Sequence, residues 1–200
     1  VTPEVYYRFP SVLSQFKQVD RIVIAHDGRP SSPLLYDAFI QGARAAGIQV
    51  YTADILPTPI VSKWANECDC MGFMVTASHN PVSDNGLKIL RPKDHLNSEQ
   101  IHILLSRLSN PIGVSQSSAV TGIQHEIIDA YLGWLGKPKL PKMNCLVDTA
   151  QGAWFHHLSI LEYLGLSVTN FHDQWQPESI NQTGSLFINQ LSSSSYDYVI

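Results

Sequence analysis

Hydrophobic and polar positions in the first half of the chain fall into short apolar runs and longer periodic stretches. Residues 21–26, 48–52 and 71–76 are short, mostly apolar runs that predict buried strands. Between them, apolar residues recur at helical spacing behind the Ser-Ser-Pro at 31–33 and the Thr-Pro at 58–59, which are typical helix starts. Strands that alternate with helices in this way predict an α/β protein.

The pattern breaks once in the middle of the chain and then begins again. Residues 109–124 contain proline, glycine and several serines, and they are the best candidate for a linker. A predicted helix that ends at Gly136 follows this segment. Strands are predicted at 144–148 and 166–171, with a helix at 153–164 between them. The second half therefore predicts another α/β unit.

These signals divide the chain into three parts. We expect a first domain at 1–110, a linker at 111–124 and an incomplete second domain at 125–200. The Thr-Pro-Glu at 2–4 is a typical helix start, so the first helix should begin at once. Residues 196–200 resemble a strand and stop without a turn signal, so we expect the chain to be part of a longer protein.

Composition and charge exclude several classes of protein. The 200 residues are 44% hydrophobic and 15% charged, which is typical of a globular protein rather than a disordered one. The 13 basic and 17 acidic residues give a net charge of −4, which offers no general attraction for nucleic acid. No apolar stretch reaches the length of a membrane span. We therefore expect neither a nucleic-acid partner nor a membrane partner.

The cysteines point to a reducing compartment. Cys68, Cys70 and Cys145 are too few, and odd in number, for a disulfide scaffold, so we expect a cytoplasmic protein. Cys68 and Cys70 lack the second pair that a zinc site needs, and core packing explains them better.

The segment with the richest chemistry is Thr-Ala-Ser-His-Asn-Pro at 76–81. It follows the third predicted strand at its carboxyl end, where α/β sheets place their ligands. It offers a hydroxyl at Ser78 and an imidazole at His79, and Lys88 follows ten residues after the serine. A nucleophile, a hydrogen-bonding group and a cation are what phosphoryl transfer requires, because that reaction depends mainly on positioning and charge neutralisation.

Two other interpretations of this segment are possible. On composition alone, Ser-His-Asn-Pro is also a plausible surface turn. A serine hydrolase is less well supported, because side chains of adjacent residues on an extended loop point apart. The chain also lacks the Gly-x-Ser-x-Gly turn of many such hydrolases.

The same segment resembles the active-site signature of the α-D-phosphohexomutases, in which the serine is phosphorylated. Four further segments resemble motifs of this family in the same order: Ala-His-Asp-Gly-Arg at 25–29 with Ser32, Leu-Pro-Thr-Pro at 56–59, Asp-Asn-Gly-Leu-Lys at 84–88 and Val-Asp-Thr-Ala-Gln-Gly-Ala at 147–153. Order and spacing agree from about residue 20 to residue 200. The resemblance therefore covers most of the chain.

The resemblance implies a fold and an activity. The first domain is expected to be a three-layer α/β/α domain with a mixed sheet, followed by the beginning of a similar second domain. The full-length protein is expected to be an isomerase that interconverts hexose 6-phosphates and 1-phosphates through phosphorylated Ser78 and a hexose bisphosphate intermediate. The 200-residue piece alone is expected to be inactive. The alternative is a catalytically silent relative that binds sugar phosphates.

The resemblance also assigns roles to four residues. Ser78 would carry the phosphate, and His79 would lie beside this nucleophile. Lys88 would act near the transferred oxygen as a general acid/base or as a charge stabiliser. Arg29 would present its guanidinium to phosphate at the end of the first strand, although arginines in such turns often pair structurally with a neighbouring carboxylate.

A metal ion is implied by the same resemblance. In the family, phosphoserine binds Mg²⁺ together with three aspartates of an Asp-Gly-Asp-x-Asp-Arg loop, and this sequence does not contain that loop. Ser78 is therefore the one predicted metal ligand here, and it cannot hold the ion strongly alone.

The choice of sugar rests on one segment. Residues 179–185, Ser-Ile-Asn-Gln-Thr-Gly-Ser, are more similar to phosphoglucosamine mutases than to phosphomannomutases. Ile89 and Leu90 point the other way, because phosphoglucosamine mutases commonly have paired aromatic residues there. Trp154 departs from the pattern of the family, which usually has small residues near that position. Glucosamine phosphate is favoured, with phosphomannomutase and phosphoglucomutase as alternatives.

Overall fold

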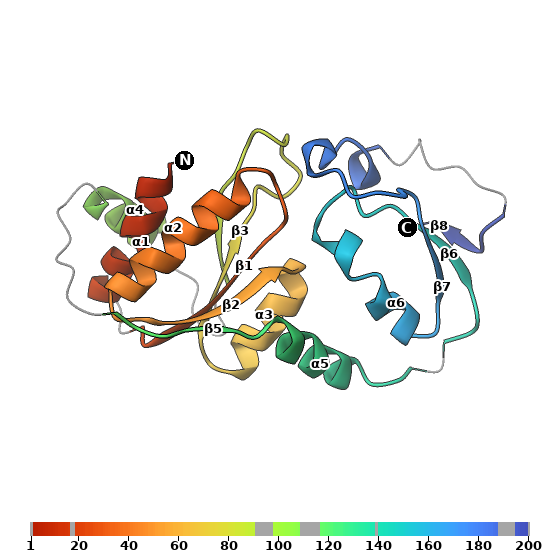
Figure 1. The fold of residues 1–200 in the computed structure, drawn as a ribbon, viewed down its shortest axis with the longest axis horizontal. Coiled ribbons are helices and arrows are strands. Elements are labelled where there is room, and N and C mark those ends of the chain that lie inside the picture. The colour runs from red at the N-terminus through yellow and green to blue at the C-terminus, as the bar shows by residue number, and fades with distance from the viewer. Residues whose placement is uncertain are drawn as a thin grey trace.

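The chain forms two α/β units that lie side by side (Figure 1). The computed structural model describes residues 2–16, 19–90, 98–108, 117–138, 140–187 and 195–199. The larger unit contains the N-terminal half of the chain and the smaller unit contains the C-terminal part (Figure 1). The α/β class predicted from the sequence is confirmed.

The sheet of the larger unit is mixed, as expected. Its order is β4-β3-β1-β2-β5. The strands are β1 (Arg21–His26), β2 (Gln49–Ile55), β3 (Met71–Val75), β4 (Leu87–Leu90) and β5 (Val120–Gly122). All neighbours are parallel except β3 and β4, which are antiparallel. The carboxyl ends of β1 and β3 therefore meet at one edge, which places the loops after His26 and Val75 together.

Helices cover both faces of this sheet and give three layers. They are α1 (Pro3–Phe16), α2 (Ser32–Ala45), α3 (Thr58–Glu67), α4 (Ser98–Arg107) and α5 (Gln124–Leu135). Alternate residues of a strand point to opposite faces. Ile22 and Ile24 pack with α1, α2 and α4, whereas Val23 and Ala25 pack with α3 and α5. All four side chains are at most 1% exposed, so both faces of β1 are buried.

The middle of the chain differs from the linker predicted at 111–124. Residues 120–122 form the edge strand β5, which pairs with β2. Ile123 and Ile127 are buried in the same core as α3, and they bring α5 against that helix. These apolar contacts attach α5 to the larger unit, although a second domain was predicted to begin at 125. Residues 111–116 of the predicted linker lie outside the described part of the chain.

The smaller unit has a parallel sheet with the order β7-β6-β8. Its strands are β6 (Asn144–Val147), β7 (Ser167–Asn170) and β8 (Tyr198–Val199), at the positions predicted from the sequence. The helix predicted at 153–164 is divided into a 3₁₀ turn, η1 (Ala153–His156), and α6 (Ser159–Tyr163). Aromatic and histidine residues with low helix propensity occupy 154–157, which is consistent with this break. Two further 3₁₀ turns are η2 (Pro177–Ser179) and η3 (Gly184–Leu186).

Among the helices of the described residues, none has the length and apolar character needed to cross a lipid bilayer.

The crossing of α1 and α2 depends on Gly42, and this dependence can be tested. A Cβ atom on Gly42 would lie 1.9 Å from the carbonyl oxygen of Tyr7, so the two helices would have to separate. We expect Gly42→Ala to lower the free energy of unfolding by about 2–3 kcal/mol in a urea titration. Gly133→Ala on α5 is the matched control, because a Cβ there meets nothing within 4 Å. It should raise stability by about 0.5–1 kcal/mol. Equal effects of the two substitutions would contradict the tight crossing.

Candidate functional site

A cleft of about 790 Å³ lies between the two units, at the carboxyl ends of β1 and β3. The larger unit lines it with Asp27, the turn at 56–59, and the loop that follows β3, including Ser78 and His79. The smaller unit contributes residues that follow β6, residues that follow η2, and the beginning of η3. They are Asp148, Thr149, Ala150, Gly152, Ala153, Trp154, Ile180, Asn181, Gly184 and Ser185. The cleft is thus built by both units, and Ser78 faces the second unit across it.

Ser78 occupies an exposed and strained turn. Its φ is +54°, in the left-handed region that residues other than glycine rarely adopt. The turn is fixed from behind by Thr76, whose hydroxyl accepts the Ser78 N–H at 3.1 Å and donates to an Asp27 carboxylate oxygen at 2.7 Å. The hydroxyl of Ser78 is therefore presented on a preformed turn at the end of a buried strand.

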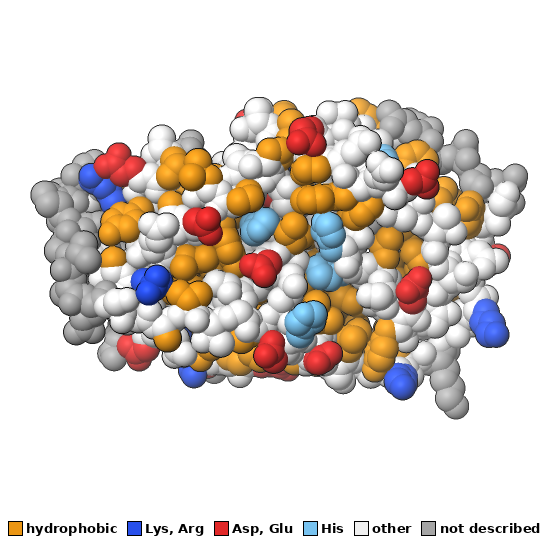
Figure 2. Space-filling model, viewed as in Figure 1, with side chains coloured by type: hydrophobic (Ala, Val, Ile, Leu, Met, Phe, Trp, Pro, Cys, Tyr) orange, Lys and Arg blue, Asp and Glu red, His pale blue; other side chains and the backbone are white. Residues whose placement is uncertain are grey.

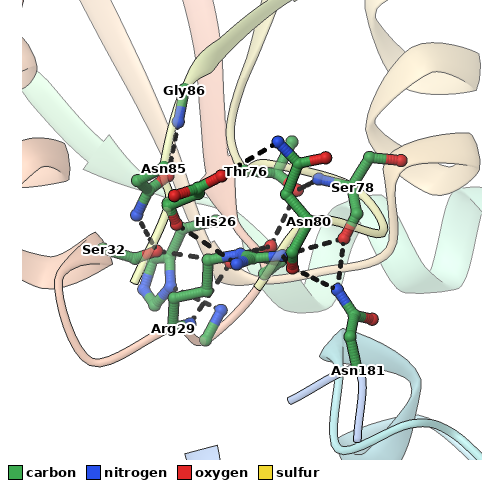
Figure 3. A network of polar contacts seen from close by, with 12 residues as sticks. His26, Arg29, Ser32, Thr76, Ser78, Asn80, Asn85, Gly86 and Asn181 are labelled. Atoms are coloured by element: carbon green, nitrogen blue, oxygen red, sulfur yellow. Dashed lines mark hydrogen bonds and ion pairs between the residues drawn. The ribbon is translucent and has the colours of Figure 1, made fainter. Parts of the chain in front are cut away.

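The loop from 78 to 84, called the Ser78 loop below, wraps around the guanidinium of Arg29. The Arg29 side chain is fully buried, and its Nε donates to Asp27 at 2.9 Å. Its remaining N–H groups donate to four main-chain carbonyl oxygens of the loop, those of Ser78, Asn80, Pro81 and Asp84 (Figure 3). A guanidinium has five N–H donors, so every donor of Arg29 has a protein acceptor.

This set of partners bears on the role of Arg29. The sequence left open a guanidinium that faces phosphate or one that pairs with a neighbouring carboxylate, and in the structure its donors face Asp27 and the main chain of the Ser78 loop. Main-chain carbonyl oxygens are compact acceptors that loops can bring together, and they satisfy a buried cation without adding another charge. Arg29 therefore holds the shape of the loop that carries Ser78.

A second set of contacts ties the far end of this loop to α2. The Asn85 amide donates to the hydroxyls of Ser31 and Ser32 at 2.9 and 3.0 Å. Ser32 in turn donates to Asp27 at 3.3 Å (Figure 3). The Thr76 N–H donates to the Gly86 carbonyl at 2.8 Å and closes the base of the loop. The segment from 76 to 86 is thus anchored at both ends.

His79 lies beside the serine hydroxyl, whereas Lys88 lies on the neighbouring strand β4. The Ser78 Oγ and His79 Nδ1 atoms are 3.4 Å apart, and both side chains are exposed in the cleft. Lys88 is exposed on β4 and is paired with Met74, which places both side chains on the same face of the sheet. Met74 lines the cleft, whereas Lys88 is not among the described residues that line it. The side chains of Ser78 and His79 therefore lie together, although adjacent side chains were expected to point apart, because the backbone at Ser78 is left-handed and not extended. Lys88 lies on the adjacent strand.

Asn181 is a residue of this site that the sequence did not single out. Its side-chain amide reaches from the smaller unit to the carbonyl oxygens of Ser78 and Asn80, at 2.7 and 2.9 Å (Figure 3). The motif at 179–185 was informative only about the sugar, because a contact over 103 positions leaves no periodic signal in a single sequence.

Histidine side chains gather along the middle of one face of the molecule, where the two units meet (Figure 2). His157 is buried, and its Nε2 atom lies 2.7 Å from the Ile55 carbonyl oxygen of the larger unit. The neighbouring His156 packs edge-on against Trp175, at 4.5 Å between ring centroids. Trp175 covers Gly28, where an added Cβ would lie 2.8 Å from the indole. These rings help to hold the smaller unit against the larger one.

Burial determines the charge of three histidines at this site, His26, His156 and His157. It lowers the pKa of His26, His156 and His157 below 6.5, the ordinary value for histidine. At His26 this effect outweighs the opposing attraction of Asp27 and other carboxylates. Hydrogen bonding to the Ile55 carbonyl opposes the burial effect at His157, but it is the smaller of the two. All three histidines are therefore neutral at pH 7.

The residues that the structure describes do not by themselves fit a magnesium site. Within the described ranges, no three His, Cys, Asp or Glu side chains converge in a way that could hold a metal ion. Ser78 offers one oxygen, whereas Mg²⁺ takes about six oxygen ligands.

Comparison with known proteins defines the family. Residues 2–108 match the family described as phosphoglucomutase/phosphomannomutase, alpha/beta/alpha domain I. The chain is 31% identical over 195 residues to a phosphoglucosamine mutase of Gloeothece citriformis, which covers 88% of the chain and 39% of that relative. It is 36% identical over 137 residues to a phosphomannomutase/phosphoglucomutase of Pseudomonas putida, which covers 66% of the chain and 29% of the relative. The chain belongs to the phosphoglucomutase/phosphomannomutase family and spans less than half the length of these relatives.

Solved structures show the same fold. A phosphoglucomutase/phosphomannomutase family protein of Burkholderia thailandensis superimposes with a TM-score of 0.72 at 23% identity. The match covers 88% of this chain and 40% of that protein. A phosphomannomutase-like protein of Thermus thermophilus gives a TM-score of 0.68 at 18% identity. The arrangement of both units is therefore a known one.

The role of Arg29 in holding the Ser78 loop leads to a stability prediction. Lysine has three donors in a different geometry, so Arg29→Lys should leave main-chain carbonyl oxygens of the Ser78 loop without their Arg29 donors. We expect the free energy of unfolding to fall by about 2–4 kcal/mol in a urea titration. Arg44→Lys is the control, because Arg44 is exposed and donates to Ser117 and Ser118 on the surface. Its effect should stay within about 0.5 kcal/mol. Similar losses of stability in the two variants would show that the Arg29 contacts stabilise the fold no more than the surface contacts of Arg44 do.

The neutral histidines lead to a prediction about pH. Their pKa values are lowered in the folded state, so the unfolded chain binds more protons once the pH falls below about 6.5. The stability present above that pH should be lost progressively toward pH 5, and Tm should fall over this range. His157→Gln should flatten the decline, whereas His125→Gln, at an exposed position of α5, should not. A Tm that rises from pH 7 to pH 5 would contradict the neutral state.

Proposed function

We propose that the protein to which this chain belongs is a phosphohexomutase that interconverts the 6-phosphate and the 1-phosphate of a hexose. The observation that supports this most strongly is the presentation of Ser78. Its hydroxyl stands on an exposed, left-handed turn at the mouth of a cleft, and a buried arginine holds the main chain beneath it. Phosphoryl transfer depends mainly on such positioning.

The proposed reaction begins with a phosphoryl group on Ser78 Oγ. The free hydroxyl of a bound hexose phosphate attacks the phosphorus, so that a new P–O bond to the sugar forms and the P–O bond to Ser78 breaks. The sugar hydroxyl gives up its proton and the serine oxygen takes up a proton. The hexose bisphosphate then reorients within the site and returns its other phosphate to Ser78. Atoms and charge balance, and the sugar leaves with its phosphate moved.

His79 and Lys88 are the proposed proton and charge carriers. The imidazole of His79 lies 3.4 Å from the serine oxygen, near the range in which a proton can be exchanged along a hydrogen bond. Lys88 starts from the strand next to Ser78, on the face of the sheet that the cleft uses. A long, flexible cation there can balance the charge that develops on the transferred group.

The sugar is proposed to be glucosamine phosphate. The Ile-Asn-Gln-Thr-Gly-Ser segment at 180–185 supports this preference. Its residues Ile180, Asn181, Gly184 and Ser185 line the cleft, whereas Gln182 is not among the described residues that line it. One relative whose similarity extends over 88% of the chain is also a phosphoglucosamine mutase. Other relatives are named phosphomannomutase/phosphoglucomutase and phosphopentomutase, so mannose and glucose phosphates are the next substrates to test. Trp154 also lines the cleft, where its ring can pack against a sugar.

The nucleophile is tested by replacing it in the full-length protein. Ser78→Ala should lower mutase turnover by about a thousand-fold or more, because no other group replaces the phosphorylated oxygen. Ser83→Ala is the control, since Ser83 is exposed in the same loop and its hydroxyl donates to the side chain of its neighbour Asp84. Its turnover should stay within about three-fold of the original. Full activity of Ser78→Ala would exclude the assignment. Binding of hexose phosphates without turnover by the original protein would favour a silent relative.

A further inference from the structure

Two carbonyl oxygens beside the nucleophile are held from both sides. The Ser78 carbonyl oxygen accepts hydrogen bonds from Arg29 Nη2 at 2.8 Å and from Asn181 Nδ2 at 2.7 Å. The Asn80 carbonyl oxygen accepts hydrogen bonds from the same two nitrogens, at 3.1 and 2.9 Å. Arg29 approaches from within the larger unit and Asn181 approaches from the smaller unit (Figure 3). A carbonyl oxygen has two lone pairs, so both oxygens are saturated.

This double contact fixes the peptide that follows Ser78. The peptide group is planar and trans, so its N–H points away from its carbonyl oxygen. Holding the Ser78 carbonyl against Arg29 and Asn181 therefore directs the His79 N–H to the opposite side. The same constraint limits the rotation of the turn that carries the Ser78 hydroxyl. The contact with Asn181 thus bears on the geometry of the nucleophile as well as on the docking of the units.

Asn181 is itself held rigidly by the smaller unit. Its N–H donates to the Ala150 carbonyl at 3.0 Å, and its φ of +62° is one that asparagine tolerates better than most residues. Two and three residues farther on, Thr183 and Gly184 donate to the carboxylate of Asp148 at 2.9 and 2.7 Å. The Asp148 side chain is only 1% exposed. The amide of Asn181 therefore projects from a preformed corner.

Backbone strain is concentrated at this contact. Among the described residues, six that are not glycine have positive φ, and four of them lie on the two sides of the contact: Ser78, Ala150, Gln151 and Asn181. Each costs about 1–3 kcal/mol and persists only where the surroundings impose it. Such strain is typical of segments whose position is selected for function rather than for stability.

We infer that Asn181 is a positioning residue, through which the second unit sets the geometry of the Ser78 loop. This inference rests on the proposed phosphoryl transfer at Ser78. The smaller unit completes the clamp that Arg29 begins, so the nucleophile is aligned when the two units are docked. Asn181 does not touch the reacting atoms and acts through the carbonyls of Ser78 and Asn80.

The test uses Asn181→Gly in the full-length protein. Glycine accepts the left-handed backbone, so only the amide contact is removed. Gln182→Ala is the matched control, because it removes a side-chain amide of the same turn that donates to Glu178 and not to the Ser78 loop. We expect kcat of Asn181→Gly to fall by about 10- to 100-fold with KM changed by less than about three-fold. The control should keep its kcat.

Hydrogen exchange supplies a readout that does not need activity. The Asn80 N–H donates to the Ala77 carbonyl within the loop, whereas the Phe73 N–H belongs to β3. In Asn181→Gly the Asn80 amide should exchange about ten-fold faster, while the Phe73 amide is unchanged. Faster exchange at Asn80 with a lowered kcat supports the inference.

Two other outcomes overturn the inference. A lower Tm with normal kcat and normal exchange at Asn80 would show that the contact only joins the two units. A loss of kcat equal to that of Gln182→Ala would show that the turn as a whole matters and not the Asn181 amide. If the original protein fails to convert hexose phosphates, the proposed function falls, and the exchange rates of Asn80 still decide whether Asn181 positions the loop.

Discussion

The buried guanidinium of Arg29 is the constraint from which the site follows. A cation without solvent must find an acceptor for each of its five donors, or it destabilises the fold by several kcal/mol. Asp27 supplies one acceptor, and the Ser78 loop bends so that four of its carbonyl oxygens supply the rest. Its shape, including the left-handed turn at Ser78, is therefore set by the cation beneath it.

The smaller unit binds the same carbonyl oxygens of the Ser78 loop as Arg29 does. Asn181 shares two of the carbonyl oxygens with Arg29, and the Asp148 carboxylate holds the turn from which Asn181 projects. Asp27 and Asp148 thus have parallel tasks, since each follows a buried strand and each fixes the loop beside it through main-chain and hydroxyl donors. The cleft lies between these two corners. A site that is assembled from both units suits a reaction that depends on alignment more than on special side-chain chemistry.

Much of this arrangement could be predicted from the sequence, because the signals were local. Apolar runs and helix starts located β1, β2, β3 and the helices between them, and the position of Ser78 after a buried strand placed it at the ligand-binding edge. The rest depends on contacts between distant residues. Apart from Asp27, the acceptors of Arg29 are main-chain oxygens 49 to 55 positions away, which no side-chain pattern reveals. The strand β5 has three exposed residues, so its sequence resembles a loop.

The most direct test of the account is to locate phosphate on the full-length protein by mass spectrometry after incubation with a hexose 1,6-bisphosphate. The account predicts one phosphate, on the peptide that contains Ser78, which is lost when a hexose monophosphate is then added in excess. Mutase turnover with an unmodified Ser78 peptide, or with phosphate on another residue, would contradict the claim that the Arg29-held loop presents the nucleophile.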